Sequence, residues 1–258
     1  MNEKKLTRQI ITKTLVKSLE PIDYIHAFWE GGAAAFNRVD QWSDIDLYLV
    51  VDDERISDAI FEVEQTLKSL SPIKQKYEPH QTIWPEIFQA FYKLENTNKY
   101  LLIDLVVIKM SSPEKFLEPE IHGNTVFFFN KFNKIKIPLL DDNATTKKLR
   151  QRISLLKTRF EIFNIFVQKE IYRGNALESM DLYYNFTLAI LVEILRIKYF
   201  PVHHDFKTRY IRAELPASAI DKLEHLFFVE GILDLQKKYH EATEWVNEEI
   251  GFLNKLKK

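Results

Sequence analysis

The stretch that decides the fold is Ser43-Asp44-Ile45-Asp46-Leu47, which continues into Tyr48-Leu49-Val50-Val51. Its apolar and β-branched residues predict a strand over 45–51. Alternate residues of a strand point to the same face, so Asp44 and Asp46 should project together. Two carboxylates at the end of a core strand repel each other and are costly to desolvate, and a divalent cation relieves that repulsion. Ligand sets made only of oxygen suit Mg²⁺ or Mn²⁺.

A third carboxylate, Asp104, interrupts the apolar run 101–108. An unpaired charge is costly inside a buried strand, so this strand should neighbour the first one and complete a cluster of three acids. Each acid also has an ordinary explanation. Asp44 is then a turn or cap residue, Asp46 an edge-strand acid facing water, and Asp104 a buried acid paired with a base. The combination favours a site, because perturbed charged groups gather at functional positions.

Gly31-Gly32 follows a short β-rich run at 24–29 and precedes the acidic pair. Glycines at such a place allow a tight turn whose amides can face phosphate oxygens. A Gly-Gly pair alone is as often a plain turn. Its position before the acids is what favours a phosphate-binding role.

The rest of the chain divides into an α+β half and a helical half. Helices are predicted at 3–19 and 54–70, and further strands at 73–77, 87–94, 100–108 and 125–129. Long helical patterns follow Pro138, at 144–172, 175–199, 216–230 and 234–256. Asn143 or Thr145 is the expected cap of the first of these helices. We therefore predict a mixed-sheet domain at 1–140 and a helical bundle at 141–258.

Composition restricts the class of protein. The chain has 258 residues, 46% hydrophobic and 28% charged, with no cysteine and a net charge of −1. These values fit a globular protein in a reducing compartment and disfavour broad nucleic-acid binding. With no secretory signal and no apolar run long enough to span a bilayer, a cytoplasmic protein without membrane contact is expected. The seven histidines form no metal-binding pattern with a cysteine or with one another, so no zinc site is predicted.

Three segments together resemble the polymerase-beta-like nucleotidyltransferase superfamily: Glu30-Gly31-Gly32-Ala33-Ala34-Ala35-Phe36, Ser43-Asp44-Ile45-Asp46-Leu47 and Ile103-Asp104-Leu105. Members of that superfamily have a Gly-Gly or Gly-Ser turn, a strand with paired acids and a later single acid. The whole chain is also similar to the two-domain aminoglycoside (kanamycin) nucleotidyltransferase type, in which a helical bundle follows the catalytic domain. The implied fold is α+β, with an N-terminal nucleotidyltransferase domain and a C-terminal, acceptor-binding bundle.

The resemblance implies transfer of a nucleoside monophosphate, AMP from ATP by default, to a hydroxyl of a small-molecule acceptor. Two Mg²⁺ ions would bind the catalytic acids Asp44, Asp46 and Asp104. The implied general base is Glu178, which shares a helix face with Asp181 and Asn185. The residues implied in nucleotide binding are Gly31, Gly32, Ala33, Arg38 and Ser43.

Two departures from the family pattern keep other functions open. Ala33 lacks the hydroxyl that often holds a phosphate, unless Gly32 is the corresponding position, and Asn37 stands where a second glycine is common. The alternatives are a catalytically weak nucleotide-binding module, or a relative of the antitoxin-type minimal nucleotidyltransferases that modify protein or RNA. A ribonuclease-type Arg196…His203 pair is disfavoured, because Pro201 breaks the helix between them and the two should not share a face. The acceptor, the nucleobase and the oligomeric state stay open.

Overall fold

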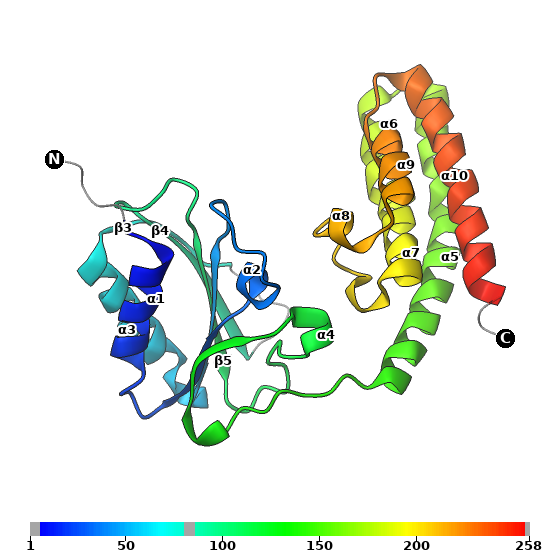
Figure 1. Ribbon diagram of the computed structural model, residues 1–258. Coiled ribbons are helices and arrows are strands. Elements are labelled where there is room, and N and C mark those ends of the chain that lie inside the picture. The colour runs from blue at the N-terminus through cyan, green and yellow to red at the C-terminus, as the bar shows by residue number, and fades with distance from the viewer. Residues whose placement is uncertain (1–5, 80–85, 256–258) are drawn as a thin grey trace. The chain divides into compact units, whose positions relative to one another are not determined.

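The computed structural model describes residues 6–79 and 86–255, with side chains as far as Leu253. The chain divides into two compact units, Met1–Leu140 and Asp141–Lys258 (Figure 1). The first unit combines a sheet with helices, and the second is helical, so the predicted α+β class is confirmed. The elements of the first unit are α1 (Arg8–Leu19), β1 (Ile25–Glu30), α2 (Gly32–Ala35), β2 (Ile45–Val51), α3 (Ile56–Leu70), β3 (Ile73–Tyr77), β4 (Ile87–Leu94), β5 (Ile103–Lys109), α4 (Pro119–His122) and β6 (Val126–Asn130).

The described strands form one six-stranded sheet in the order β3-β4-β5-β2-β1-β6. β2 and β5 are parallel neighbours, and the other adjacent pairs are antiparallel. The loop that contains Asn96, Thr97 and Asn98 joins β4 to β5 as a hairpin. This order places β2, with its paired acids, next to the strand that carries Asp104.

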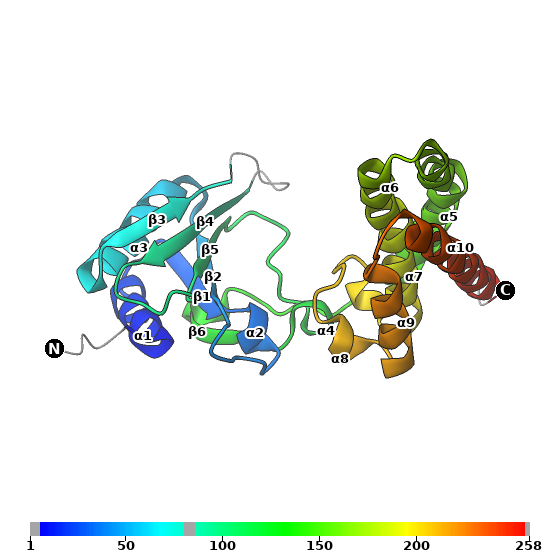
Figure 2. The same cartoon turned by 90° about the horizontal axis from the view of Figure 1, so that it is seen from above.

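The two faces of the sheet have different coverings (Figures 1 and 2). Ile45, Leu47 and Leu49 of β2 are fully buried in a core shared with α1 and α3. Because side chains alternate along a strand, Asp46 and Tyr48 project to the opposite face, where α2 and α4 lie. The sheet thus buries one side of β2 and presents the acids on the other.

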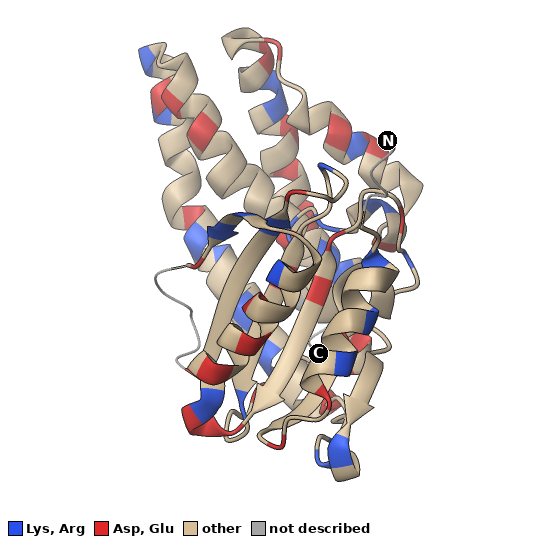
Figure 3. Cartoon of the chain, turned by 90° about the vertical axis from the view of Figure 1, so that its left-hand side faces the viewer, with Lys and Arg blue, Asp and Glu red and all other residues tan. Residues whose placement is uncertain are grey.

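Charge differs between the two helices on the covered face (Figure 3). α1 carries Arg8, Lys13 and Lys17 and no acid, whereas α3 carries three acids, Asp58, Glu62 and Glu64, and one base. The two helices also pack against each other through their apolar residues. Exposed pairs of opposite charge contribute little to stability, and burial of the apolar stripes contributes more.

The second unit has a single core, made by helices that surround α7. Its elements are α5 (Asp142–Arg173), α6 (Ala176–Leu182), a π-helical turn (Tyr183–Leu188), α7 (Ala189–Tyr199), α8 (Ile211–Glu214), α9 (Ala217–Phe227) and α10 (Ile232–Lys255). Gly174, with φ of 76°, ends α5, and Pro201 follows the end of α7. Among the described residues, every helix is too short or too polar to cross a membrane.

Three local expectations differ from the structure. The helix predicted at 3–19 begins only after Thr7, whose hydroxyl accepts a hydrogen bond from the Ile10 amide and caps α1. Leu6 forms a β-bridge with Thr97 instead of continuing the helix, and residues 3–5 lie outside the described residues. Asp141, and neither Asn143 nor Thr145, caps α5, because its carboxylate accepts from the Ala144 amide at 2.9 Å.

The third difference is the break in the helix predicted at 175–199. The adjacent residues Tyr183 and Tyr184 donate to the carbonyls of Leu226 and Phe227, at 3.1 and 2.6 Å. Consecutive residues of a regular α-helix point about 100° apart. The extra residue of the π turn lets both hydroxyls reach adjacent carbonyls at the end of α9.

Candidate metal and nucleotide site

Asp46 and Asp104 are register partners on the parallel strands β2 and β5. Paired residues of adjacent strands project to the same face, so the two carboxylates leave the sheet side by side. Both residues are half-buried, whereas their sequence neighbours Ile45, Leu47, Ile103 and Leu105 are buried. Two neighbouring strands therefore each place one acid on the face opposite the helix-covered core.

Asp44 immediately precedes β2 and lies beside Leu102, the residue just before β5. Its carboxylate accepts a hydrogen bond from the Leu102 amide, and the Ile45 amide donates to the Leu102 carbonyl at 2.9 Å. Burial raises the pKa of Asp44, while the Leu102 hydrogen bond and the positive charge of Arg8 oppose that rise. Asp44, Asp46 and Asp104 thus gather at the same end of two neighbouring strands, and their role as metal ligands stays a prediction.

Arg8, the first residue of α1, is not predicted from the sequence, and it holds the backbone at the start of β2. Its guanidinium donates to the Glu30 carboxylate and to the carbonyls of Ser43, at 3.0 Å, and Asp44. Glu30 is 7% exposed. Burial raises the pKa of Glu30, Arg8 lowers it, and the nearby charge of Asp46 raises it further. One arginine therefore compensates a buried acid and holds the backbone that carries Asp44.

The glycine turn packs directly on the acids. The Gly31 amide donates to the Asp46 carbonyl at 2.9 Å. Gly32 has φ of 53°, and a Cβ on it would overlap the Asp46 carboxylate, so only glycine fits there. Asn37 also has φ of 53°, a conformation that asparagine tolerates better than most residues. The asparagine at a common glycine position therefore keeps the backbone that a glycine would adopt.

Gln89 is a second residue that the sequence does not reveal. It lies on β4, and its side-chain amide donates to both carboxylate oxygens of Asp104, at 2.9 and 3.1 Å. Each carboxylate oxygen has a second lone pair, so these bonds orient Asp104 and leave it able to bind a cation. Partners of this kind fix the direction of a metal ligand. A polar residue within the apolar pattern of β4 is the available signal, but its partner depends on strand pairing.

Ser43 and Arg38 lie in the loop between α2 and β2. The Ser43 hydroxyl donates to Asp40 at 2.7 Å and accepts from the Asp40 amide at 2.9 Å, so it closes this loop. Ser43 also lines, with Arg8, a hollow of about 370 Å³. Arg38 is exposed, and its guanidinium lies 5.3 Å from the centre of the Phe36 ring. Neither placement tests the predicted nucleotide contacts.

Glu178 belongs to the second unit. It is exposed in the first turn of α6, and Asn185 donates to Asp181 at 2.9 Å on the face that the three were expected to share. Its role as general base stays a prediction.

The break predicted at Pro201 is observed, because α7 ends at Tyr199 and His203 lies in the following turn, so Arg196 and His203 share no helix face, yet both contact Glu214. Arg196 donates to one oxygen of Glu214 at 2.5 Å, and His203 contacts the other at 2.8 Å. The turn at Pro201–His203 folds the chain back and brings the two together. All three side chains are at most 2% exposed, so Arg196 and Glu214 form a buried ion pair beside His203, and burial keeps an RNA phosphate in solvent from reaching it.

No family model and no curated protein matches the chain. Solved structures that match include an aminoglycoside 6-adenyltransferase from Bacillus subtilis, with 12% identity, 95% of this chain and 92% of that chain covered, and a TM-score of 0.32. A STING-associated CdnE c-di-GMP synthase from Capnocytophaga granulosa matches with 13% identity, coverages of 96% and 81%, and a TM-score of 0.31. JHP933 from Helicobacter pylori matches with 14% identity, coverages of 98% and 100%, and a TM-score of 0.28.

Proposed function

We propose that the chain is a Mg²⁺-dependent nucleotidyltransferase that moves AMP from ATP to a hydroxyl of a small-molecule acceptor. The observation that carries this proposal is the register pairing of Asp46 with Asp104, with Gly32 packed against the Asp46 carboxylate. The glycine turn proposed to bind phosphate is thus in contact with the acids proposed to bind magnesium. Nucleotidyl transfer needs the phosphates and the metal ions to be held together in this way.

The donor set fits magnesium. Asp44, Asp46 and Asp104 offer only oxygen atoms, which Mg²⁺ prefers. The nearby charge of Asp46 raises the pKa of the buried Glu30, and a cation bound at these acids would offset that charge. Two magnesium ions, when bound, activate the attacking oxygen and neutralise the triphosphate and the leaving pyrophosphate.

The protein's own groups position the phosphates, the acids and the acceptor. Because the Gly31 amide donates to the Asp46 carbonyl, phosphate contact at this turn falls to the amides of Gly32 and Ala33. Backbone amides need no hydroxyl, so Ala33 is compatible with this role. Gln89 and Arg8 hold Asp104 and the Asp44 backbone at fixed angles, which limits the reorganisation required during transfer. Glu178, from the second unit, is the proposed base for the acceptor hydroxyl.

Pyrophosphate release from MgATP over a panel of hydroxyl-bearing acceptors tests the proposal. Asp104→Asn should lower turnover at least about 100-fold, since it removes a charged ligand for the magnesium ions that would neutralise the phosphates in the transition state. Asp58→Asn is the matched control, because Asp58 is an exposed acid on α3 of the same unit. Full turnover in Asp104→Asn removes Asp104 from the site. ATP binding without pyrophosphate release across the whole panel favours the catalytically weak nucleotide-binding module instead.

A further inference from the structure

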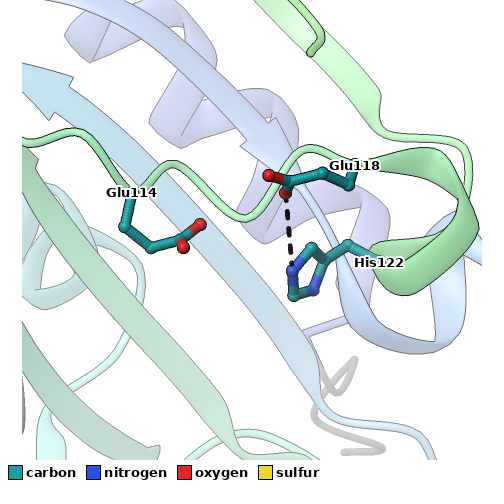
Figure 4. Close-up of side chains that lie close together, drawn as sticks. All are labelled: Glu114, Glu118 and His122. Carbon is teal, nitrogen blue, oxygen red and sulfur yellow. Dashed lines mark ion pairs between the residues drawn. The ribbon is translucent and has the colours of Figure 1, made fainter. Parts of the chain in front are cut away.

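The loop between β5 and β6 brings together two glutamates and a histidine. One ligand atom from each of Glu114, Glu118 and His122 lies within 4.8 Å of the other two (Figure 4). The Glu118 Oε2 atom and the His122 Nε2 atom are 3.8 Å apart. These residues lie apart in sequence from Asp44, Asp46 and Asp104, and the proposed transfer does not use them.

We propose that Glu114, Glu118 and His122 bind a borderline divalent cation, of which Zn²⁺ is the best fit. Two carboxylates and one imidazole form a mixed oxygen and nitrogen set, whereas the hard ion Mg²⁺ is served by oxygens alone. Three protein ligands leave a coordination position for water or another group. The sequence prediction of no zinc site considered histidines only with cysteines or other histidines, and so passed over the Glu118-x-x-x-His122 spacing.

Phe116 contacts both Glu114 and His122, and a short helix sets Glu118 beside His122. Glu118 caps α4 and His122 ends it, so one helical turn puts the two side chains on the same face. A Glu114 oxygen accepts from the Phe116 amide at 2.8 Å, which fixes this carboxylate in the loop. The His122 ring meets the Phe116 ring edge-on, with centroids 5.5 Å apart.

The neighbouring base, Lys115, is bonded to the main chain, and its charge also interacts with Glu114 and Asp53. The Lys115 ammonium donates to the carbonyls of Lys109, at 3.1 Å, Met110, at 3.3 Å, and Ser112. The hydrogen bonds of this ammonium thus go to main-chain oxygens, and the ligand atoms of Glu114 and Glu118 lie within 4.8 Å of each other. Glu118 and His122 are 26% and 29% exposed, so an ion can enter from solvent.

The loop is also fastened to the glycine turn. The Asn124 amide donates to the Ala35 carbonyl at 2.8 Å, and the Phe116 ring packs on Tyr48, 6.0 Å between centroids. Tyr48 in turn lies against Gly31, where a Cβ would come within 2.7 Å of its ring. A cation held by this loop would therefore stiffen the segment that supports α2.

The test is Zn²⁺ and Co²⁺ titration of the full chain after chelator treatment, followed by calorimetry and the visible absorbance of Co²⁺. The background is Asp44→Asn/Asp46→Asn, which disables the proposed magnesium site, so the outcome is independent of nucleotidyl transfer. We expect one Zn²⁺ per chain. Glu118→Gln and His122→Asn should each weaken binding more than about 10-fold, because loss of a direct ligand exceeds the effect of losing an outer partner.

His225→Asn is the matched control, since His225 also contacts a glutamate, Glu241, at 3.2 Å on the surface of the second unit. It should leave the affinity unchanged. Circular dichroism of each variant should match that of the background. Absence of Zn²⁺ binding in the folded background chain overturns the proposal, and so does unchanged affinity in both Glu118→Gln and His122→Asn.

Discussion

At the residue scale, the addition of a single methyl group at Gly32 should both destabilise the fold and weaken metal binding. Gly32→Ala places a methyl group where the Asp46 carboxylate lies, at a φ of 53° that L-residues avoid. The unfavourable backbone conformation alone costs about 1 kcal/mol of stability. The displaced carboxylate should weaken Mn²⁺ binding at least about 10-fold, as measured by electron paramagnetic resonance titration.

Gly251→Ala is the control for this substitution. Gly251 lies in α10, and no atom is within 4 Å of a Cβ built on it. The change should leave Mn²⁺ binding intact and raise the free energy of unfolding by up to about 1 kcal/mol, because alanine is the better helix former. Equal Mn²⁺ affinity in Gly32→Ala and the wild type would contradict the contact between the turn and the metal site.

Arg8 and Glu30 give a second prediction, about stability. Arg8→Met leaves Glu30 charged and buried, and this should lower the free energy of unfolding, measured in urea, by about 3–5 kcal/mol. Arg8→Met/Glu30→Leu removes both charges and should recover most of that loss. Arg212→Met, which breaks an exposed pair with Glu224, should leave stability nearly unchanged. A double variant as unstable as Arg8→Met alone would show that Arg8 acts mainly through the Ser43 and Asp44 carbonyls.

The amino-acid sequence predicts the acids of the candidate site, but not Arg8 and Gln89, the residues that hold those acids in place. Asp46 and Asp104 stand out because each interrupts apolar sequence, and Asp44 because it lies two residues before Asp46 at the start of a strand. Arg8 is 35 residues from Ser43, and Gln89 is 15 from Asp104. Contacts over such separations depend on which strands and helices become neighbours, and single-residue patterns carry no information on that.

At the element scale, the residue composition of a segment predicts several strands with the observed bounds. The bounds expected for β2, β3 and β4 coincide with those observed. Periodicity does not predict the π turn at Tyr183–Leu188, where two tyrosine hydroxyls bond to carbonyls at the end of α9, 43 residues away in sequence. It also gives no direction for a strand pair, and the parallel alignment of β2 with β5 is what sets Asp46 opposite Asp104.

The contact of α5 with α7 yields a pH-dependent prediction. Arg152 of α5 donates two hydrogen bonds, at 2.5 and 2.8 Å, to Glu193 of α7. Burial raises the pKa of Glu193, but the bonds from Arg152 and His204 outweigh burial and hold the pKa below its ordinary value of 4.5. Since the folded-state pKa is depressed, this stabilisation is present above pH 4.5 and is lost as the pH falls through the folded value.

Glu193→Gln should therefore lower the free energy of unfolding by about 2 kcal/mol at neutral pH. The difference from the wild type should shrink as the pH falls below 4.5. Urea unfolding at a series of pH values, followed by circular dichroism, measures it. Glu161→Gln is the control, because Glu161 is 60% exposed and meets Lys157 only at 3.7 Å. A difference that stays constant with pH would contradict the assigned ion pair.

At the scale of the whole molecule, the proposed chemistry is divided between the two units. The three acids, the glycine turn, Arg8 and Gln89 belong to Met1–Leu140, whereas Glu178 belongs to Asp141–Lys258. The core clusters follow the same division among the described residues, since each lies wholly on one side of Leu140. Each unit therefore has the buried apolar surface that folding alone requires.

Expression of 1–140 and 141–258 as separate chains should give two cooperatively unfolding proteins, the second with the stronger helical circular dichroism. The first fragment should bind Mn²⁺ with the affinity of the full chain, because every proposed ligand and its supports come from that unit. It should release no pyrophosphate with acceptors that support turnover of the full chain, because the proposed base is missing. Turnover by the 1–140 fragment alone would remove Glu178 from the mechanism and place the acceptor's base within the first unit.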